Sequence, residues 1–177
     1  MKKKTLWLTQ TAMLIALLLV LQSVTKGGGQ YVTGSCVNAV LAVAALVAGI
    51  GSAAVVALVS PFAAFLLGIG PQLLPIVPAI ALGNLVYVAV LWVITKRHKL
   101  MSTRGVIAWL TASVCKFLTL YLVVVQLLCR ILTLKEQQIA TFTAMFSWPQ
   151  LVTALVGGGA ALLVASALRS SHNVGWV

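Results

Sequence analysis

The sequence predicts an all-α membrane protein, a bundle of six transmembrane helices in one domain over residues 1–177 with both termini in the cytoplasm. Hydrophobic residues make up 62% and charged residues 7% of the 177-residue chain, against about 45–50% and about 25% in soluble domains. A membrane-spanning helix takes about 20 apolar residues. The chain is therefore long enough for six spans and short loops, and it leaves no room for a separate soluble domain.

Glycine, proline and charged residues divide the chain into six apolar runs. The triplet Gly27 to Gly29 predicts the end of the first helix and a flexible loop through about Gly34. Segment 68–78 holds three prolines and two glycines, which predicts an ordered loop or a short re-entrant piece. The polar stretch LKEQQ separates the last two runs. The predicted spans are residues 6–24, 35–50, 53–67, 79–95, 106–132 and 148–168.

The distribution of basic residues predicts the orientation, because cytoplasmic loops carry the excess of Lys and Arg. With the N-terminus inside, eight basic residues lie on the inner side and three on the outer side. The inner residues are Lys2, Lys3, Lys4, Lys96, Arg97, Lys99, Arg104 and Arg169, and the outer residues are Lys26, Arg130 and Lys135. We therefore expect both termini in the cytoplasm and the protein in the lipid bilayer of a plasma membrane.

The composition also excludes several classes of function. With 1 Asp+Glu in the chain, acid/base enzymes and carboxylate metal sites lack their usual residues. The cysteines show no metal-ligand spacing, no Walker motif is present, and the cations form no basic stripe for nucleic acid. We expect no catalytic residues, metal or cofactor. The Gly157 to Gly159 triplet predicts close helix packing, because a phosphate loop within the bilayer has no access to nucleotide.

Lys116 is the most informative residue. It lies about ten residues into the fifth predicted span, where a charge costs at least about 2.5–3.5 kcal/mol and must be compensated. At 100° per residue, Thr119, Gln126 and Arg130 share its side of an α-helix, which predicts one polar stripe rising to the outer surface. Two interpretations remain open for Lys116, a hydrogen-bond donor to an anionic substrate group or a packing residue that bonds helix ends and carbonyls.

Further polar residues are expected at the outer side of the bundle. Asn38 and Asn84 lie within about two turns of the outer ends of their spans, and Tyr87 shares a face with Asn84. Intramembrane amides also serve as interhelical hydrogen bonds, so each has a structural alternative. We expect Asn38 and Asn84 to face a cavity that opens to the outer side, and Gln30 and Trp148 would close this cavity from above. Trp148 suits a lipid-interface anchor equally well.

A resemblance to a transporter family covers nearly the whole chain and is clearest in its first spans. Its first span, KKKTLWLTQTAMLIALLLVLQ, carries an Ala12-x-x-x-Ala16 face, and the second begins YVTGSCVNAVLAVAALVAG. With the six-span pattern and the segment SPFAAFLLGIGPQLLPIVPAIALGNLVYV, the chain resembles the substrate-binding S-components of energy-coupling factor (ECF) transporters of bacteria. Small residues four apart let another helix approach closely in lipid.

The resemblance implies a multi-pass protein of a prokaryotic plasma membrane that binds a vitamin or related micronutrient from outside. It also implies that the Ala12 and Ala16 face docks on a membrane coupling subunit driven by a pair of cytoplasmic ATPases. One acidic residue in the chain disfavours a cationic ligand such as thiamine, whereas Lys116 and Arg130 favour an anionic or neutral one. Lipoate, nicotinate, pantothenate, a folate, a flavin and a cobalamin all remain open.

Two other functions stay possible from the sequence. The first is a self-contained small carrier or channel, which the absence of a visible internal repeat disfavours. The second is a membrane scaffold that binds no small molecule.

Overall fold

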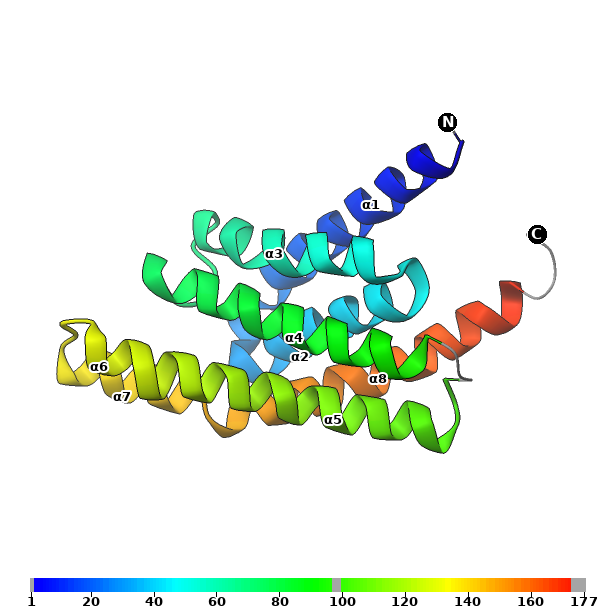
Figure 1. Ribbon diagram of the computed structural model, residues 1–177. Helices are drawn as coiled ribbons and strands as arrows, with labels where there is room; N and C mark the ends of the chain where they lie inside the picture. Colours follow the sequence, from blue (N-terminus) through cyan, green and yellow to red (C-terminus); the bar gives the residue numbers. More distant parts are fainter. Residues whose placement is uncertain (1, 97–99, 173–177) are drawn as a thin grey trace.

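The described part of the chain, residues 2–96 and 100–172 of a computed structural model, is helical throughout and contains no strand. Figure 1 shows long helices packed side by side, with the start of α1 and the end of α8 at the same end of the bundle. The α-helices are α1 (Lys2–Thr25), α2 (Gly29–Val43), α3 (Ile50–Leu66), α4 (Val77–Thr95), α5 (Thr103–Leu120), α6 (Cys129–Ile131), α7 (Glu136–Met145) and α8 (Trp148–His172). Arg97, His98 and Lys99, part of the predicted inner basic cluster, lie outside the described residues.

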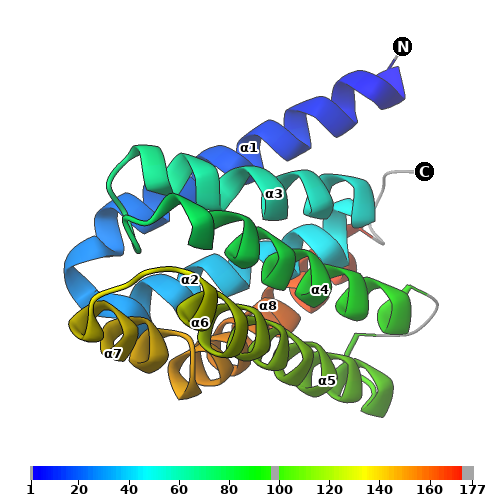
Figure 2. The ribbon, with the colours of Figure 1, turned by 60° about the vertical axis from the view of Figure 1, so that its left-hand side comes forward.

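The predicted loop after the first helix is wrong. Lys26–Gly28 form a 3₁₀ turn and α2 begins at Gly29, where the chain turns back toward the other end of the bundle (Figures 1 and 2). Only Gly29, at φ 75°, takes a positive φ in this triplet. One residue with that backbone freedom suffices to separate two helices, so the remaining glycines extend the helical structure.

The second and third apolar runs form the helices α2 and α3, which are joined as a helical hairpin. The last turn of α2 continues as a π-helix, Ala44–Ala48, and the chain reverses at Gly49, which has φ 88°. The proline-rich segment is an ordered connection, as predicted, with a 3₁₀ turn at Leu74–Ile76. The next helix, α4, begins at Val77, and Pro78 lies within its first turn, where a missing N–H costs no hydrogen bond.

The fifth predicted span is one long helical segment with a change of winding. After Leu120, α5 continues as a π-helix, Tyr121–Leu128, and ends in the short α6. Each residue of a π-helix turns the chain by less than the 100° of an α-helix, because its hydrogen bonds span five residues. Side chains beyond Leu120 therefore point in directions that α-helical spacing does not predict.

Between α6 and α8 lies a helix that the sequence analysis missed. In α7, the Lys135 backbone N–H donates to Gln138 Oε1 at 3.0 Å and closes the first turn. Ile139, Phe142 and Phe146 pack against the cluster around Leu120 and Val124. These three apolar residues are three and four positions apart, which is typical of a helix. The sequence analysis missed the helix because it interpreted the polar stretch LKEQQ as a connection between two spans.

The last helix, α8, packs closely against α2 and α5. A Cβ at Gly157 would lie 2.3 Å from the Ser35 carbonyl oxygen and 2.8 Å from the Ala39 nitrogen. The predicted close packing at the Gly157 triplet is thus confirmed, since only glycine allows the two backbones to approach this closely.

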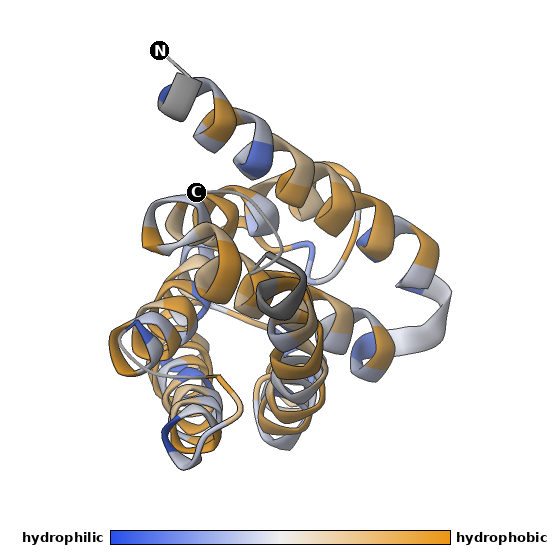
Figure 3. Ribbon diagram, turned by 90° about the vertical axis from the view of Figure 1, so that its right-hand side faces the viewer, coloured by the Kyte–Doolittle hydropathy of each residue, from blue (hydrophilic) through white to orange (hydrophobic). Residues whose placement is uncertain are grey.

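The surface of the bundle is suited to lipid. Four described segments are long and apolar enough to cross a membrane, Lys4–Ala48, Leu74–Thr95, Thr103–Ile131 and Glu136–Leu168, and Ile50–Leu66 is a shorter apolar helix. The first of them includes both α1 and α2. Hydrophobic residues recur along the outward parts of the helices in Figure 3, and leucines and valines such as Leu17, Val93 and Leu163 are exposed.

Candidate functional site

The centre of the site is the buried ammonium group of Lys116 on α5. Lys116 is 3% exposed, and its Nζ donates hydrogen bonds to Asn38 Oδ1 on α2 and to Asn84 Oδ1 on α4, both at 2.6 Å. Short bonds from a charged donor are about twice as strong as neutral ones. Both acceptors are uncharged carboxamides, so three helices meet at a cation whose charge these two partners solvate without neutralising it.

A second layer of contacts fixes these groups against α8. Lys116 Nζ lies 5.4 Å from the ring centroid of Tyr87, within the range of a cation–π interaction, and the buried Tyr87 hydroxyl donates to the Ala154 carbonyl at 3.3 Å. Asn38 Nδ2 donates to Thr153 Oγ1 at 3.2 Å. With its amide anchored in this way, Asn38 presents its oxygen to the ammonium group.

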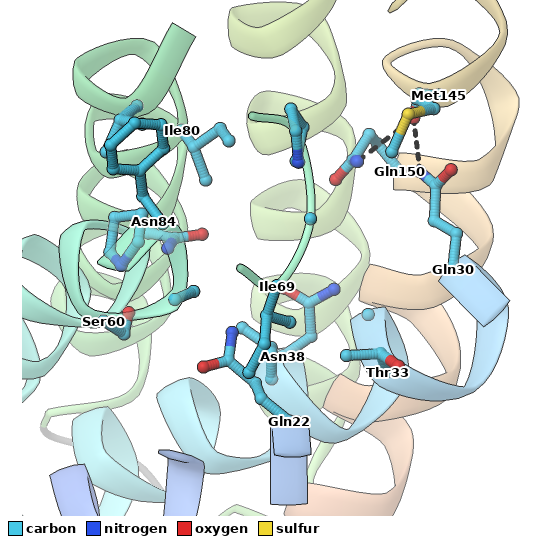
Figure 4. A pocket seen from close by; sticks show the side chains of 18 of the residues that line it. Gln22, Gln30, Thr33, Asn38, Ser60, Ile69, Ile80, Asn84, Met145 and Gln150 are labelled. Atoms are coloured by element: carbon cyan, nitrogen blue, oxygen red, sulfur yellow. Dashed lines mark hydrogen bonds between the residues drawn. The ribbon is translucent and has the colours of Figure 1, made fainter. Parts of the chain in front are cut away.

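Lys116, Asn38 and Asn84 line a cavity of about 250 Å³ toward the end of the bundle opposite the start of α1 and the end of α8. Figure 4 shows labelled side chains from α1, α2, α3, α4 and α8 pointing into this space. The other polar residues in its lining are Gln22, Lys26, Gln30, Thr33, Ser60 and Gln150, and apolar lining comes from Val37, Pro61, Ala64, Phe65, Ile69, Pro71, Val77, Ile80, Met145 and Phe146.

The mouth of the cavity is formed by chain connections. Gln30 Nε2 and Gln150 Nε2 both donate to the Met145 carbonyl, the latter at 3.1 Å, which joins the start of α2 to the α7–α8 corner. The segment Ile69 to Pro71, which follows α3, also lines the cavity. The exposed Lys26 completes it.

The cavity presents positive charge and hydrogen-bonding groups but no carboxylate. Lys116 and Lys26 are its charged residues, and Glu136, the one acidic residue of the chain, lies on the exposed first turn of α7 outside the lining. Such a surface complements an anionic or oxygen-rich molecule. Among the described residues, no group of three His, Cys, Asp or Glu side chains could hold a metal ion.

Four residues singled out in the sequence line the cavity, namely Lys116, Asn38, Asn84 and Gln30. Tyr87 lies next to Lys116 without lining the cavity. The remaining four, Thr119, Gln126, Arg130 and Trp148, are absent from its lining. Thr119 donates its hydroxyl hydrogen to the Cys115 carbonyl at 2.8 Å within its own helix.

The predicted polar stripe along the fifth span is interrupted by the π-helix. Arg130 Nη2 donates to Gln126 Oε1 at 2.6 Å, and Gln126 Nε2 donates to the Tyr121 hydroxyl at 3.0 Å. Trp148 is 70% exposed and stacks on Phe117 with 6.1 Å between ring centroids. These residues form a polar and aromatic group that is separate from the cavity lining and lies at the same end of the bundle as the cavity.

Two lining residues that the sequence analysis missed carry unpaired polar atoms. Gln22 on α1 and Ser60 on α3 are 7% and 1% exposed, and neither Gln22 Oε1 nor Ser60 Oγ has a hydrogen-bond partner. Each is a polar residue inside an apolar run, which is the signal that also identified Asn38 and Asn84. Buried polar atoms are normally paired with protein or water, so these two are exceptions among the residues that line the cavity.

Comparison with known proteins places this architecture in a family. The comparisons with curated proteins and with solved structures give no match. Residues 7–169 match the family model described as "ECF transporter, substrate-specific component". That match spans most of the chain, including every helix that lines the cavity, and the chain therefore belongs to the family of substrate-specific components of ECF transporters.

Proposed function

We propose that this chain is the membrane subunit that captures a vitamin or related micronutrient, anionic or neutral, for an ECF-type ABC importer. The observation that carries the proposal is the cavity of about 250 Å³ around Lys116, whose buried ammonium group has two neutral amide partners and no carboxylate. A charge retained inside a membrane protein without a counter-charge is a functional-site signal. An anionic ligand supplies the missing negative charge.

The proposed ligand contacts are the cavity-lining residues Lys116, Asn38, Asn84 and Gln30. Lys116 donates to an acidic or carbonyl oxygen of the ligand, and the two asparagines hold the ammonium group in place for it. Tyr87 positions Lys116 from behind. Because Thr119, Gln126, Arg130 and Trp148 lie outside the lining, they are not proposed as contacts.

The size of the cavity restricts the ligand. Pockets for drug-sized molecules measure about 300–1,000 Å³, and this cavity is slightly smaller. It suits a small acid of the size of nicotinate, lipoate or pantothenate better than a folate or a cobalamin.

The proposed orientation places the cavity mouth outside the cell. If α1, α2 and α3 each cross the membrane, as do α4, the α5–α6 segment and α8, the chain has six spans and its termini share one side. The start of α1 and the end of α8 lie at the same end of the bundle (Figure 1), and the basic residues favour the cytoplasm for that end. The mouth near Lys26 and Gln30 then faces the exterior of a prokaryotic plasma membrane.

Release of the ligand to the cell requires partners. Ala12 and Ala16 on α1 are exposed, and we propose that this face contacts a membrane coupling subunit that two cytoplasmic ATPases drive. Small side chains let helices approach closely where lipid provides no hydrophobic drive. The chain itself acts as a binding subunit and not as an enzyme.

A purification experiment tests the proposal. The tagged chain, extracted from its native membrane in mild detergent, is expected to bring with it a membrane protein, two ATPases and a bound small acid, all identified by mass spectrometry. Transport of a small acid into liposomes by the chain alone would instead establish the self-contained carrier. A chain that purifies without ATPases or ligand, and binds no small acid when one is added, would be a scaffold.

A further inference from the structure

We infer that Gln22 and Ser60 contact the ligand, and that the ligand is therefore a small oxygen acid that also carries a hydroxyl or an N–H group. The inference rests on the proposed function, because it concerns the same cavity. It narrows the ligand from an acid of suitable size to an acid with hydrogen-bond donors.

The carboxamide of Gln22 supports the inference through its unpaired oxygen. Gln22 lies three residues before the end of α1, is 7% exposed, and Figure 4 shows its side chain extending into the cavity. Its Oε1 accepts no hydrogen bond. A carboxamide oxygen only accepts, so the group that satisfies it must be a donor.

Ser60, on another helix, adds a second free polar group, whose hydroxyl can accept a hydrogen bond from the ligand or donate one to it. A buried hydroxyl inside a helix commonly bonds a carbonyl one turn earlier, as Ser113 bonds the Trp109 carbonyl at 2.8 Å and Thr95 bonds the Leu91 carbonyl at 2.6 Å. Ser60 is 1% exposed and makes no such bond. Its hydroxyl is left free at the cavity wall, next to Pro61.

The other residues of this cavity leave the two atoms for a ligand. The lining is otherwise mostly apolar, and the donors of Lys116 and Asn38 are directed to other residues, Lys116 to two asparagine oxygens and Asn38 to Thr153. Leaving a buried polar atom unpaired is unfavourable, whereas an apolar residue at either position would avoid that cost. An acid with a hydroxyl or N–H places its acidic oxygen at Lys116 and its donor at Gln22 or Ser60.

Three probe molecules distinguish the contacts made by the acidic group of the ligand from those made by its hydroxyl or N–H group. Pantothenate has a carboxylate, an amide N–H and two hydroxyls, pantothenol replaces only the carboxylate with an alcohol, and lipoate has a carboxylate but no hydroxyl or N–H. Titration calorimetry on the purified chain is expected to show pantothenate binding at least about tenfold more tightly than either of the others, since each lacks one set of contacts.

Three variants test the two residues. Gln22→Met and Ser60→Ala are each expected to weaken pantothenate binding about fivefold to tenfold, to leave lipoate binding unchanged, and to leave the melting temperature unchanged or higher. The matched control is Ser52→Ala, on the same helix as Ser60. Ser52 is buried and bonded to the Thr11 hydroxyl at 2.8 Å, outside the cavity, so this variant should lower the melting temperature without changing affinity.

Several results would overturn the inference. The first is a lower melting temperature with unchanged pantothenate affinity in Gln22→Met and Ser60→Ala. The second is lipoate binding that is as tight as pantothenate binding. The third is that the chain binds no acid that carries a hydroxyl or N–H group. If the chain in any of these cases still purifies with two ATPases, the inference fails while the proposed function stands. If the ATPases are also absent, the proposed function fails as well.

Discussion

Lys116 is a buried ammonium group held by neutral oxygens. A carboxylate partner would cancel its charge and compete with any anionic ligand, whereas Asn38 and Asn84 orient the group and leave its charge available. The Tyr87 ring, 5.4 Å from Nζ, adds a third uncharged contact. The site is thus electrostatically prepared for an anion before the anion arrives, which reduces the reorganisation needed on binding.

Replacing Lys116 with methionine tests this role directly. Lys116→Met keeps most of the side-chain length and removes the charge, so we expect binding of the co-purified ligand to weaken at least about tenfold, because a charged hydrogen bond contributes about 1.5–3 kcal/mol. Titration calorimetry measures the affinity, and the melting temperature shows whether the variant is folded. Thr119→Val, on the same helix but outside the cavity lining, is the control and should bind normally. Unchanged affinity in folded Lys116→Met would assign the lysine to helix packing.

Gly157 provides a second test at the residue scale, of packing rather than binding. A methyl group there would lie 2.3 Å from the Ser35 carbonyl oxygen, so Gly157→Ala must push α8 away from α2 and is expected to cost about 1–3 kcal/mol of stability. Gly51→Ala is the matched control, because its Cβ meets no atom closer than 3.4 Å. Thermal unfolding in detergent compares the two variants. Equal melting temperatures would contradict the close α2–α8 approach.

At the scale of elements, the sequence predicted where the helices lie, but not which parts of them are π-helical. The apolar runs predicted six of the helical segments, with ends that differ from the observed ones by up to six residues, the largest difference being at the start of α2. The prediction for Gln126 and Arg130 relied on 100° per residue, and the π-helix at Tyr121–Leu128 changes that angle. Hydrophobic pattern does not distinguish the two kinds of winding in so apolar a segment, so these residues were expected on the side of Lys116.

The first helix connects the proposed site to the proposed partner. Its last turns place Gln22 in the cavity, while Ala12 and Ala16 are exposed about two turns earlier. Figures 1 and 2 show the N-terminal part of α1 extending away from the other helices. One rigid helix thus bears both the cavity wall and the face proposed for docking.

Replacing both alanines separates binding from uptake. Ala12→Leu with Ala16→Leu adds bulk to an exposed face without touching the cavity, so ligand affinity should be unchanged while ATP-driven uptake by the assembled complex falls to background. Uptake of radiolabelled ligand into cells and co-purification of the coupling subunit are the two measurements. Leu17→Ala, also exposed on α1, is the control and should transport normally. Normal uptake by the double variant would remove the docking role from this face.

At the scale of the whole molecule, the site exists only where seven helices, α1 to α5, α7 and α8, contribute to one cavity. Asn38, Asn84 and Lys116 were each predicted as site residues because a polar group lies inside an apolar span, with the two asparagines near the outer ends of their spans and Lys116 about ten residues into its own. Gln22 and Ser60 could not be assigned in this way. A lone glutamine or serine in an apolar run is equally typical of an interhelical hydrogen bond, and only the packed structure shows that their polar atoms are unpaired.

The orientation of the bundle decides whether the cavity receives its ligand from outside, and cysteine labelling measures it. After replacement of the three native cysteines, Cys36, Cys115 and Cys129, with alanine, single cysteines are introduced at Lys4, Lys26 and Lys135, all of which are exposed. A membrane-impermeant maleimide applied to intact cells should label positions 26 and 135, because the excess of basic residues places the opposite end in the cytoplasm. Position 4 should react only after the cells are permeabilised. Labelling of position 4 alone in intact cells would place the cavity mouth in the cytoplasm, where a subunit for uptake could not collect its ligand.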